Sequence, residues 1–270
     1  MLDLERRNNR RAPLSLRVRL AVKRGIDIVL SILLLLLLSP LLALTALIIL
    51  VSSGAPILFR QTRVGRNGRE FVMIKFRTMS TDAEQQLDEI KAENQRTGPL
   101  FKVNNDPRVT TVGRVLRRSS IDELPQLFNV LAGSMSLVGP RPALPAEVVE
   151  FSDELRRREL LPQGLTGLWQ LDGRTDPDFT KYAELDLRYV EHWTLRLDLW
   201  IIIRTPFVIL GHLICRDAVD AVEPTSNATS NTTSTTGVPF IPADALRTAP
   251  RIEPQIADLV RRDSSLELAE

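Results

Sequence analysis

The sequence predicts a mainly helical α+β protein with one membrane-associated helix near its N-terminus. Two observations favour this class: an almost wholly apolar run from Ile28 to Val51, and strand-like segments on either side of the Gly65–Gly68 turn. A hydrophobic content of 44% in 270 residues supports a substantial core, and the net charge of +2 implies no polyanionic partner. The single cysteine, Cys215, excludes an internal disulfide, and the isolated His192 and His212 argue against a zinc site.

The apolar run is interrupted only by Ser31, Ser39, Pro40 and Thr45. At about 1.5 Å per residue, it is long enough to cross a bilayer core of roughly 30 Å, and it lacks the cleavage site of a signal peptide. The segment before it is basic, with Arg6, Arg7, Arg10, Arg11, Arg17, Arg19, Lys23 and Arg24. This arm resembles a nucleic-acid arm in composition, but beside the apolar run it is better explained as a cytoplasmic anchor.

The far flank of the apolar run is basic as well, with Arg60, Arg63, Arg66, Arg69, Lys75 and Arg77. Both flanks therefore prefer the cytoplasm. Ser39-Pro40 lies near the middle of the run, where proline removes a backbone donor and can break or kink the helix. The residues alone leave two topologies open: a kinked span, or a helix that enters the membrane, bends and leaves on the same side.

The rest of the chain is expected to form short strands, helices and a tail. In order, we expect strands at Pro56–Gln61 and Glu70–Thr78, an acidic helix at Thr81–Gln95, a loop at Asn104–Arg108, a basic helix at Val109–Arg118 with Val112, Val115 and Leu116 on its apolar side, a charged helix at Ala146–Leu161, a turn–strand–turn at Gly164–Gly173 that carries Trp169, and a helix at Asp178–Val190. Leu195–Ile214 is too polar for a second span, so we expect it to lie in a membrane interface with Trp193 and Trp200 at headgroup depth. The Ser/Thr/Asn-rich stretch Glu223–Gly237 indicates a disordered tail.

The segment Ser119–Pro142 carries an acidic pair, Asp122-Glu123, and a Gly-Pro-Arg-Pro turn. Ser120 and Glu123 have capping-box spacing, so both acids can be explained as favouring the start of a helix that runs through Leu131. Pro125 fits a first helical turn and would move the cap to Ile121 or Asp122. A helix N-terminus would also keep Asp122 ionised and oriented, as a carboxylate nucleophile requires.

Cationic residues precede and follow this acidic pair. Lys75 and Arg77 end a predicted strand, Arg114, Arg117 and Arg118 line a predicted helix, and Arg141 stands between two prolines. An arginine in such a rigid turn is a natural bidentate phosphate ligand, and Glu123 beside a phosphate is a sensible Mg²⁺ ligand. The alternative is that these cations reach anionic lipid headgroups.

Several motifs in this order resemble those of the bacterial sugar transferases, the monotopic polyprenyl-phosphate phosphoglycosyl transferases that initiate exopolysaccharide and glycan assembly. They are Lys23-Arg24 and Asp27 ahead of the Ser-Pro-interrupted run, KFRTM, DPRVTTVGRVLRRSSIDELPQLFNVLAGSMSLVGPRP, GLTGLWQLDGRT and ELDLRYV. The resemblance runs from about Val22 to Cys215. It implies a re-entrant membrane helix (residues 25–55) broken at Ser39-Pro40 and a catalytic domain (56–215) on the cytoplasmic face of the bacterial inner membrane. It does not cover the basic arm (1–24) or the Ser/Thr-rich tail (216–270), which we expect to be disordered.

The resemblance also implies a reaction and its residues. A sugar-1-phosphate would pass from a nucleotide diphosphate sugar, usually a UDP-sugar, to undecaprenyl phosphate, with release of UMP. Asp122 would be the nucleophile that carries the phospho-sugar, and Glu123 would hold Mg²⁺. The residue pattern itself, and not the resemblance, gives the candidate substrate-binding residues Lys75, Arg77, Arg114, Arg117, Arg118 and Arg141. The expected partners are the two substrates and inner-membrane lipid, with a homodimer compatible with the family and no nucleic acid.

Two departures from the family pattern, Pro162-Gln163-Gly164 and Asp172, fall in a loop expected to contact the nucleotide-sugar, so the resemblance does not name the sugar. Two other functions compete with the transferase. One is a catalytically silent, membrane-anchored scaffold of polysaccharide assembly, against which the intact Asp122-Glu123 pair argues. The other is a polytopic glycosyltransferase with true spans at Ile28–Val51 and Leu195–Ile214.

Overall fold

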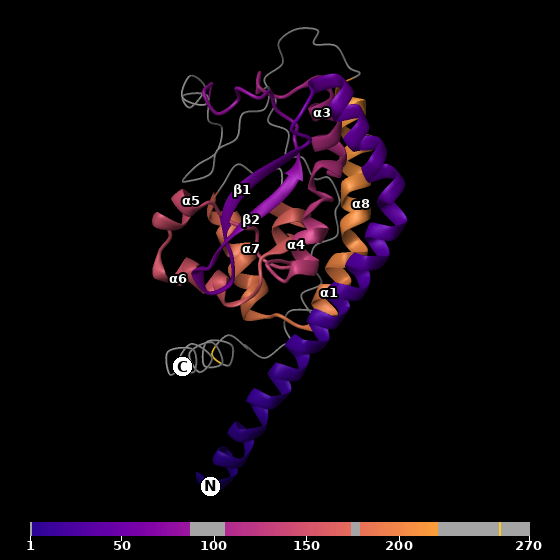
Figure 1. The fold of residues 1–270 in the computed structure, drawn as a ribbon. Helices are drawn as coiled ribbons and strands as arrows, with labels where there is room; N and C mark the ends of the chain where they lie inside the picture. Colours follow the sequence, from indigo (N-terminus) through magenta and orange to yellow (C-terminus); the bar gives the residue numbers. More distant parts are fainter. Residues whose placement is uncertain (1, 87–105, 174–178, 221–253, 255–270) are drawn as a thin grey trace, which may run out of the picture.

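The computed structural model describes residues 2–86, 106–173, 179–220 and 254. Helices dominate these residues, and the strands form two sheets of two strands each. A long N-terminal helix runs along one side of a compact body (Figure 1). The prediction of a mainly helical chain with a long apolar helix and few short strands is confirmed. Most of the predicted tail lies outside the described residues.

The N-terminal helix α1 spans Leu2–Ser53 and includes the predicted basic arm. It was expected to break at Ser39-Pro40, but its helical structure continues through both residues, and the ribbon bends along its length instead (Figure 1). Pro40 cannot donate to the carbonyl of Leu36, four residues earlier. The Ser39 hydroxyl donates to that carbonyl at 2.9 Å, so the acceptor that proline leaves unpaired is satisfied and the helix persists.

Polar side chains of α1 attach the helix to the folded body. Lys23 forms a 2.7 Å ion pair with Asp198 and donates to the carbonyl of Val138 at 2.9 Å. Asp27, one turn further on, accepts from the amide of Leu137 at 3.0 Å. Arg24 donates to the last carbonyls of helix α4 (Gln126–Ala132), including that of Leu131 at 2.7 Å. This part of the predicted cytoplasmic anchor therefore makes specific contacts with the domain.

The predicted hairpin is present as β1 (Leu58–Val64) and β2 (Glu70–Phe76), antiparallel and joined through η1 (Arg66–Gly68). Residues 81–86, the described part of the predicted acidic helix, form turns. The basic helix is α3 (Thr111–Ser119), capped by the Thr110 hydroxyl. Leu116 is buried as expected, but Val115 is 62% exposed, because it lies away from the body.

After α4 the chain forms β3 (Ser136–Val138), which pairs in parallel with β4 (Gly164–Thr166). The charged segment between them was expected to be one helix, Ala146–Leu161. It is instead three short pieces: α5 (Pro145–Val149), α6 (Asp153–Arg156) and the 3₁₀ turn η4 (Arg157–Leu160). Ser152 interrupts the helix because its hydroxyl accepts from the amide of Leu155 and caps α6.

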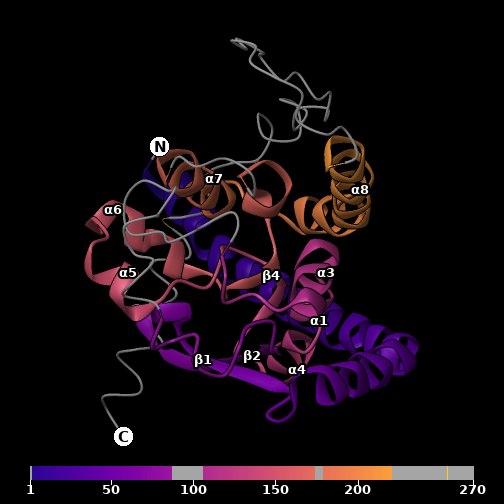
Figure 2. The same ribbon diagram turned by 90° about the horizontal axis from the view of Figure 1, so that it is seen from above.

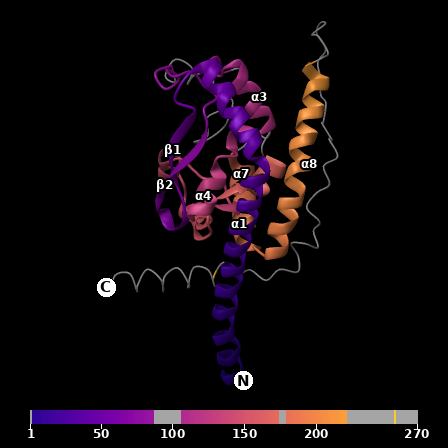
Figure 3. The same cartoon turned by 45° about the vertical axis from the view of Figure 1, so that its right-hand side comes forward.

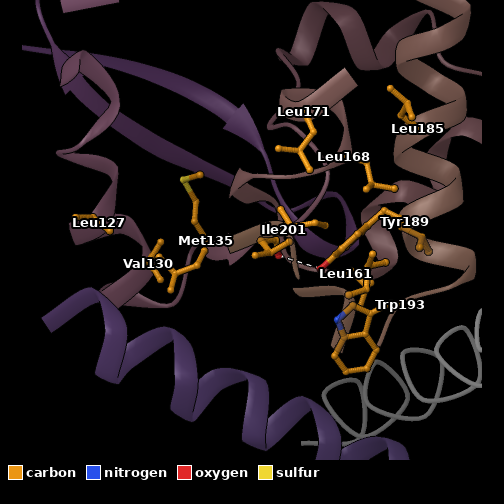
Figure 4. Close-up of a cluster of buried hydrophobic side chains, with 14 of the residues drawn as sticks. Leu127, Val130, Met135, Leu161, Leu168, Leu171, Leu185, Tyr189, Trp193 and Ile201 are labelled. Carbon is orange, nitrogen blue, oxygen red and sulfur yellow. Dashed lines mark hydrogen bonds between the residues drawn. The ribbon is translucent and has the colours of Figure 1, made fainter. Parts of the chain in front are cut away.

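The chain continues from β4 through the π-helical turn η5 (Trp169–Gly173) to α7 (Phe179–Glu191) and α8 (Leu195–Asp220). Both predicted C-terminal helices are confirmed, although α8 continues beyond the predicted start of the tail at residue 216. Residues from α4, α7, α8 and the β3–β4 region form the main core (Figure 4). Trp193 and Tyr189 are fully buried within it, so the expected position of Trp193 at headgroup depth is wrong: its indole donates to the buried Asp198 instead.

Helices α1 and α8 leave apolar side chains uncovered. They meet at the Lys23–Asp198 pair and then diverge along their lengths (Figure 3). Large apolar residues recur at helical spacing on the exposed side of α8: Leu199, Ile203, Phe207 and Leu210. Within the described residues, only the Leu16–Ser53 part of α1 is long and apolar enough to cross a membrane; an 18-residue stretch of it has a mean hydropathy of 2.9 and few buried residues.

Candidate active site

Asp122 and Glu123 lie in a 3₁₀ turn of their own, η3 (Ile121–Glu123), between α3 and α4. Ser120 adopts a left-handed conformation (φ 57°) that ends α3 and turns the chain, and its side chain makes no capping hydrogen bond. Helix α4 begins only after Pro125. The predicted single helix capped at Ser120 is therefore wrong, and this acidic pair, hereafter the dyad, lies ahead of α4 instead of in its first turn.

Two cations from different elements face the dyad. Lys75 comes from β2 and Arg117 from α3, and each interacts electrostatically with both Asp122 and Glu123. Burial, followed by repulsion from Arg117 and Arg63, lowers the pKa of Lys75 to about 8. Burial likewise lowers the pKa of Arg117, against the attraction of Asp122. The fold thus brings two predicted phosphate ligands to the predicted catalytic carboxylates.

The Asn129 side chain holds the dyad segment against the strand that carries Lys75. Its amide donates to the carbonyl of Val72 at 2.7 Å and accepts from the amide of Ile74 at 3.1 Å. Asn129 therefore pairs with the free edge of β2 as a neighbouring strand would. Because Asn129 belongs to α4 and Lys75 to β2, this contact sets the register between the two parts of the site.

Helix α3 is held at the end of the same strand. Arg117 donates through Nε to the Thr78 hydroxyl at 2.8 Å. Gly113 packs directly on the backbone of Thr78, since a Cβ at this glycine would lie 2.0 Å from the Thr78 carbonyl oxygen. Close backbone packing of this kind requires glycine. It brings the C-terminal half of α3, with Arg117, towards the dyad.

Arg141 is the third predicted ligand with a defined place. It belongs to the segment Gly139–Pro142, hereafter the Arg141 loop, which follows β3. Its guanidinium lies 5.9 Å from the centre of the Tyr182 ring and 3.4 Å from a carboxylate oxygen of Glu147. Burial opposes the charged form, but Tyr182 and Glu147 outweigh it and raise the pKa of Arg141 above its ordinary value.

The other predicted ligands have different surroundings. Arg77 is buried and donates to the carbonyls of Ser53 and Gly54 at 2.6 and 2.7 Å, so it ties β2 to the end of α1. Arg114 is exposed and contacts Thr111 in its own helix at 3.4 Å. Arg118 is also exposed on α3. Substrate binding by these three residues stays a prediction.

The sequence interpretation missed a buried basic cluster next to Arg141. Arg63 is 6% exposed and Arg158 is 1% exposed. Arg158 forms a 2.6 Å ion pair with Asp186, and burial raises the pKa of Asp186 to about 6 although Arg158 opposes the shift. Arg63 had been counted only as one of the basic flanking residues. Arg158 stands among charged neighbours, and no local pattern distinguishes its burial.

The site residues fit a magnesium ion that is shared with a substrate. Among the described residues, no group of three or more His, Cys, Asp or Glu side chains is placed to enclose a metal. Mg²⁺ does not need such a cage, since it commonly binds one or two carboxylates and completes its shell with water and substrate phosphates. The half-buried carboxylate of Glu123 has no hydrogen-bond partner within the described residues.

Carboxylates gathered with ammonium and guanidinium groups form a site suited to phosphate esters. The family model described as bacterial sugar transferase matches residues 18–212. The chain belongs to the bacterial sugar transferase family.

Individual relatives agree with this family. The chain is 42% identical to the undecaprenyl-phosphate galactose phosphotransferase of Salmonella typhimurium, over 70% of this chain and 40% of that protein. It is 41% identical to the UDP-glucose:undecaprenyl-phosphate glucose-1-phosphate transferase of Escherichia coli, over 69% of this chain and 39% of that protein. It is 40% identical to the exopolysaccharide production protein ExoY of Sinorhizobium fredii, over 70% of this chain and 86% of that protein. The chain thus spans less than half the length of the first two.

Proposed function

We propose that this protein transfers a sugar-1-phosphate from a nucleotide diphosphate sugar, in the first instance a UDP-sugar, to undecaprenyl phosphate. The observation that carries the proposal is the convergence of the dyad with Lys75 and Arg117 in a chain of this family. Relatives named for undecaprenyl-phosphate sugar transfer support the same reaction. The products would be undecaprenyl diphospho-sugar and UMP, and the reaction would begin an exopolysaccharide or related glycan.

In the proposed mechanism Asp122 is the nucleophile. Its carboxylate oxygen forms a bond to the phosphorus that bears the sugar, and the bond from that phosphorus to the bridging oxygen breaks, so UMP leaves with the electron pair. An oxygen of undecaprenyl phosphate then attacks the same phosphorus and the bond to Asp122 breaks, which restores the carboxylate. Lys75 and Arg117 neutralise negative charge on the phosphate oxygens in both steps. Two steps through one nucleophile predict ping-pong kinetics.

Glu123 is the proposed ligand of Mg²⁺, together with oxygens of the donor diphosphate. A bound Mg²⁺ would supply additional positive charge to the phosphate oxygens. The position of Glu123 beside Asp122 in η3 supports this role, since one turn would then present both the nucleophile and the metal ligand to the same substrate.

We further propose that α1 enters the bacterial inner membrane and returns to the cytoplasmic face, with the catalytic body on that face. Its apolar run, Ile28–Val51, would be about 36 Å long at 1.5 Å per residue, close to a bilayer core of roughly 30 Å, so the proposal rests on other features of the helix and not on its length. The bend of the helix, its basic flanks and the exposed apolar faces of α1 and α8 all support this topology. Labelling of cysteines placed at each end of Leu16–Ser53 tests it, and an end reachable only from the periplasm would contradict re-entry.

The decisive experiment measures UMP release from several UDP-sugars in the presence of undecaprenyl phosphate and Mg²⁺. The parent chain should release UMP with at least one donor, whereas Asp122→Asn should lose on the order of 10³-fold or more in turnover. Glu123→Gln should lose activity together with its Mg²⁺ dependence. Substantial turnover by folded Asp122→Asn would remove Asp122 as nucleophile. Release of no UMP by the parent with any donor would favour a silent scaffold.

A further inference from the structure

The Arg141 loop is held in place through its backbone carbonyls. Two of its residues are prolines, which have no amide hydrogen to donate. The carbonyl of Pro140 accepts from the amide of Gly164 at 2.8 Å. The next two carbonyls accept from guanidinium groups: that of Arg141 from Arg158, and that of Pro142 from Arg63 at 3.0 Å. Three successive carbonyls are thus fixed by donors from outside the loop.

The use of buried guanidinium groups for this purpose is unusual. A charged group is costly to bury, and an amide or hydroxyl would serve as a donor to a carbonyl. The charge of Arg158 is balanced by Asp186. The hydrogen bonds of Arg63 go to neutral oxygens, those of Pro142 and of the Gln61 side chain, and among the described residues its Nε has no acceptor.

Arg63 also lies close to other charges on both sides. It interacts electrostatically with Arg141 and, more weakly, with Glu123, so it lies within electrostatic range of both the Arg141 loop and the dyad. After burial, repulsion by Arg141 is the next cause that lowers the pKa of Arg63, which falls to about 10. Two like charges kept together in a protein favour an anion beside them.

The Arg141 side chain is the part of this cluster that solvent and ligands reach, at 26% exposure. A guanidinium has five N–H donors, and Arg141 contacts Glu147 only at 3.4 to 3.5 Å. Tyr182 lies against its guanidinium and also accepts from Arg158 at 2.9 Å. The side chain is therefore oriented but retains donors for a further acceptor.

We propose that Arg63 and Arg158 are positioning residues that fix the Arg141 loop so that Arg141 binds the phosphate that leaves with the nucleotide. This inference rests on the proposed function and extends it to one subsite of the donor. Arg158 acts through the carbonyl of Arg141. Arg63 acts through the carbonyl of Pro142 and adds positive charge next to Arg141.

The nucleotide phosphate suits this subsite better than the phosphate of the lipid. The donor carries two linked phosphates, and with one at Asp122 the other must extend away from the nucleophile. Arg63, which interacts with both Glu123 and Arg141, marks such a direction. Glu147, the partner of Arg141, belongs to α5, which lies on the opposite side of the body from the apolar helices α1 and α8 (Figures 1 and 2). A water-soluble nucleotide can approach from that side.

The test compares Arg63→Met with a matched control, Arg60→Met, in the full chain. Arg60 is an exposed residue of the same strand. For Arg63→Met we expect the dissociation constant of UMP, measured by equilibrium dialysis, to rise about 10- to 100-fold, since charge-assisted hydrogen bonds are involved. The KM for the UDP-sugar should rise similarly, while the KM for undecaprenyl phosphate stays within about twofold. Arg60→Met should bind UMP as the parent chain does.

A second pair of variants keeps the test conclusive if Arg63→Met does not fold. Arg158→Met combined with Asp186→Leu replaces a buried ion pair by apolar groups, which proteins often tolerate. It should weaken UMP binding, whereas Tyr182→Phe, which keeps the ring, should weaken it less. Unchanged UMP affinity in folded variants, or an equal rise in both KM values, would overturn the proposal. UMP binding needs no chemistry, so a parent chain that binds UMP but transfers nothing would contradict the transferase and leave this subsite intact.

Discussion

Two buried charged groups of this protein differ in how completely their members are paired. In the first, hereafter the Lys23 cluster, the carboxylate of Asp198 receives Lys23 at 2.7 Å, Tyr189 at 2.6 Å and Trp193 at 3.0 Å. In the second, the dyad faces Lys75, whose ammonium group makes no hydrogen bond within the described residues and lies 5.2 Å from the centre of the Phe59 ring. The charge that joins α1 to the body is thus fully paired, whereas the ammonium group of Lys75, a proposed phosphate ligand, keeps donors for a substrate.

The largest effect should come from breaking the saturated cluster. Lys23→Met leaves the carboxylate of Asp198 buried without its cation, and we expect the free energy of unfolding to fall by about 3 to 5 kcal/mol. Denaturant unfolding in detergent measures this change. Lys23→Met with Asp198→Asn keeps an oxygen for Tyr189 and Trp193 and removes the unpaired charge, so it should recover much of the loss. A single variant as stable as the parent would show that the cluster does not hold α1.

A smaller loss should follow from Asn129→Asp, which changes neither charged group directly. The new carboxylate oxygen would face the carbonyl of Val72 where the amide now donates at 2.7 Å. We expect a loss of about 1 to 3 kcal/mol in stability and about tenfold in turnover, because Lys75 and the dyad lose their shared register. Ser134→Ala serves as the control, because it removes the 3.3 Å contact to the same amide and the donation of the Ser134 hydroxyl to the Asn129 carbonyl at 3.1 Å but leaves both contacts of Asn129 to β2 in place. Equal turnover in the two variants would contradict the role of Asn129.

The buried ammonium group of Lys75 predicts an unusual pH dependence of activity. Lys75 has a pKa of about 8 in the folded chain, through burial and its neighbours Arg117 and Arg63, against Asp122 and Glu123. Above pH 8 it loses the charge that holds phosphate, so kcat/KM should fall roughly tenfold per pH unit. In Lys75→Met, kcat/KM should be lower than in the parent at neutral pH and should show no such fall at alkaline pH. A parent profile that stays flat to pH 10 would contradict the assignment.

The free energy of unfolding should rise over the pH range in which kcat/KM falls. In the unfolded chain Lys75 has its ordinary pKa near 10.5, so between pH 8 and 10.5 the unfolded state binds more protons than the folded state. The free energy of unfolding therefore gains a contribution that rises with pH across this range. Comparison of thermal unfolding between the parent and Lys75→Met isolates this contribution, and identical pH slopes would show that Lys75 is not buried as described.

The smallest effect is expected for Arg114→Gln. Arg114 is exposed on α3 and pairs with no acid among the described residues. A screened surface charge should change the KM for the UDP-sugar by about twofold or less, with no change in stability. A tenfold change in KM would instead place Arg114 at the donor and retain it as the sequence-predicted ligand.

Much of the fold follows from local patterns. The hairpin, α3, α7 and α8 were predicted because their turn residues and apolar periodicity act over a few neighbours. The single helix expected at Ala146–Leu161 failed because Ser152 caps a new helix inside a charged segment. The break expected at Ser39-Pro40 failed because one hydroxyl supplies the missing donor.

The candidate site likewise contains residues that local patterns predict and residues that they do not. The dyad, Lys75, Arg117 and Arg141 were recognised from residue type and motif, and the structure gathers them around two connected groups. Arg63 and Arg158 were not, since their significance lies in carbonyls 79 and 17 residues away. In the sequence Asn129 cannot be distinguished from any other helix residue, because its contacts to β2 appear only in the folded structure. Contacts between distant segments carry this information, and no local pattern contains it.

The Lys23 cluster has a consequence for the order in which the protein is made. Lys23 and Asp198 are 175 residues apart. At a translation rate of about 5 to 20 residues per second, roughly 9 to 35 s pass before the ribosome supplies the acid that neutralises this lysine. During that interval α1 has its apolar surface but lacks Asp198, and until 115 residues after Lys23 have been made it lacks Val138 as well. A chain that stops before Asp198 therefore lacks the acid that forms the 2.7 Å ion pair with Lys23 and leaves this lysine with Asp27 of its own helix, which distinguishes an unfinished chain from a complete one.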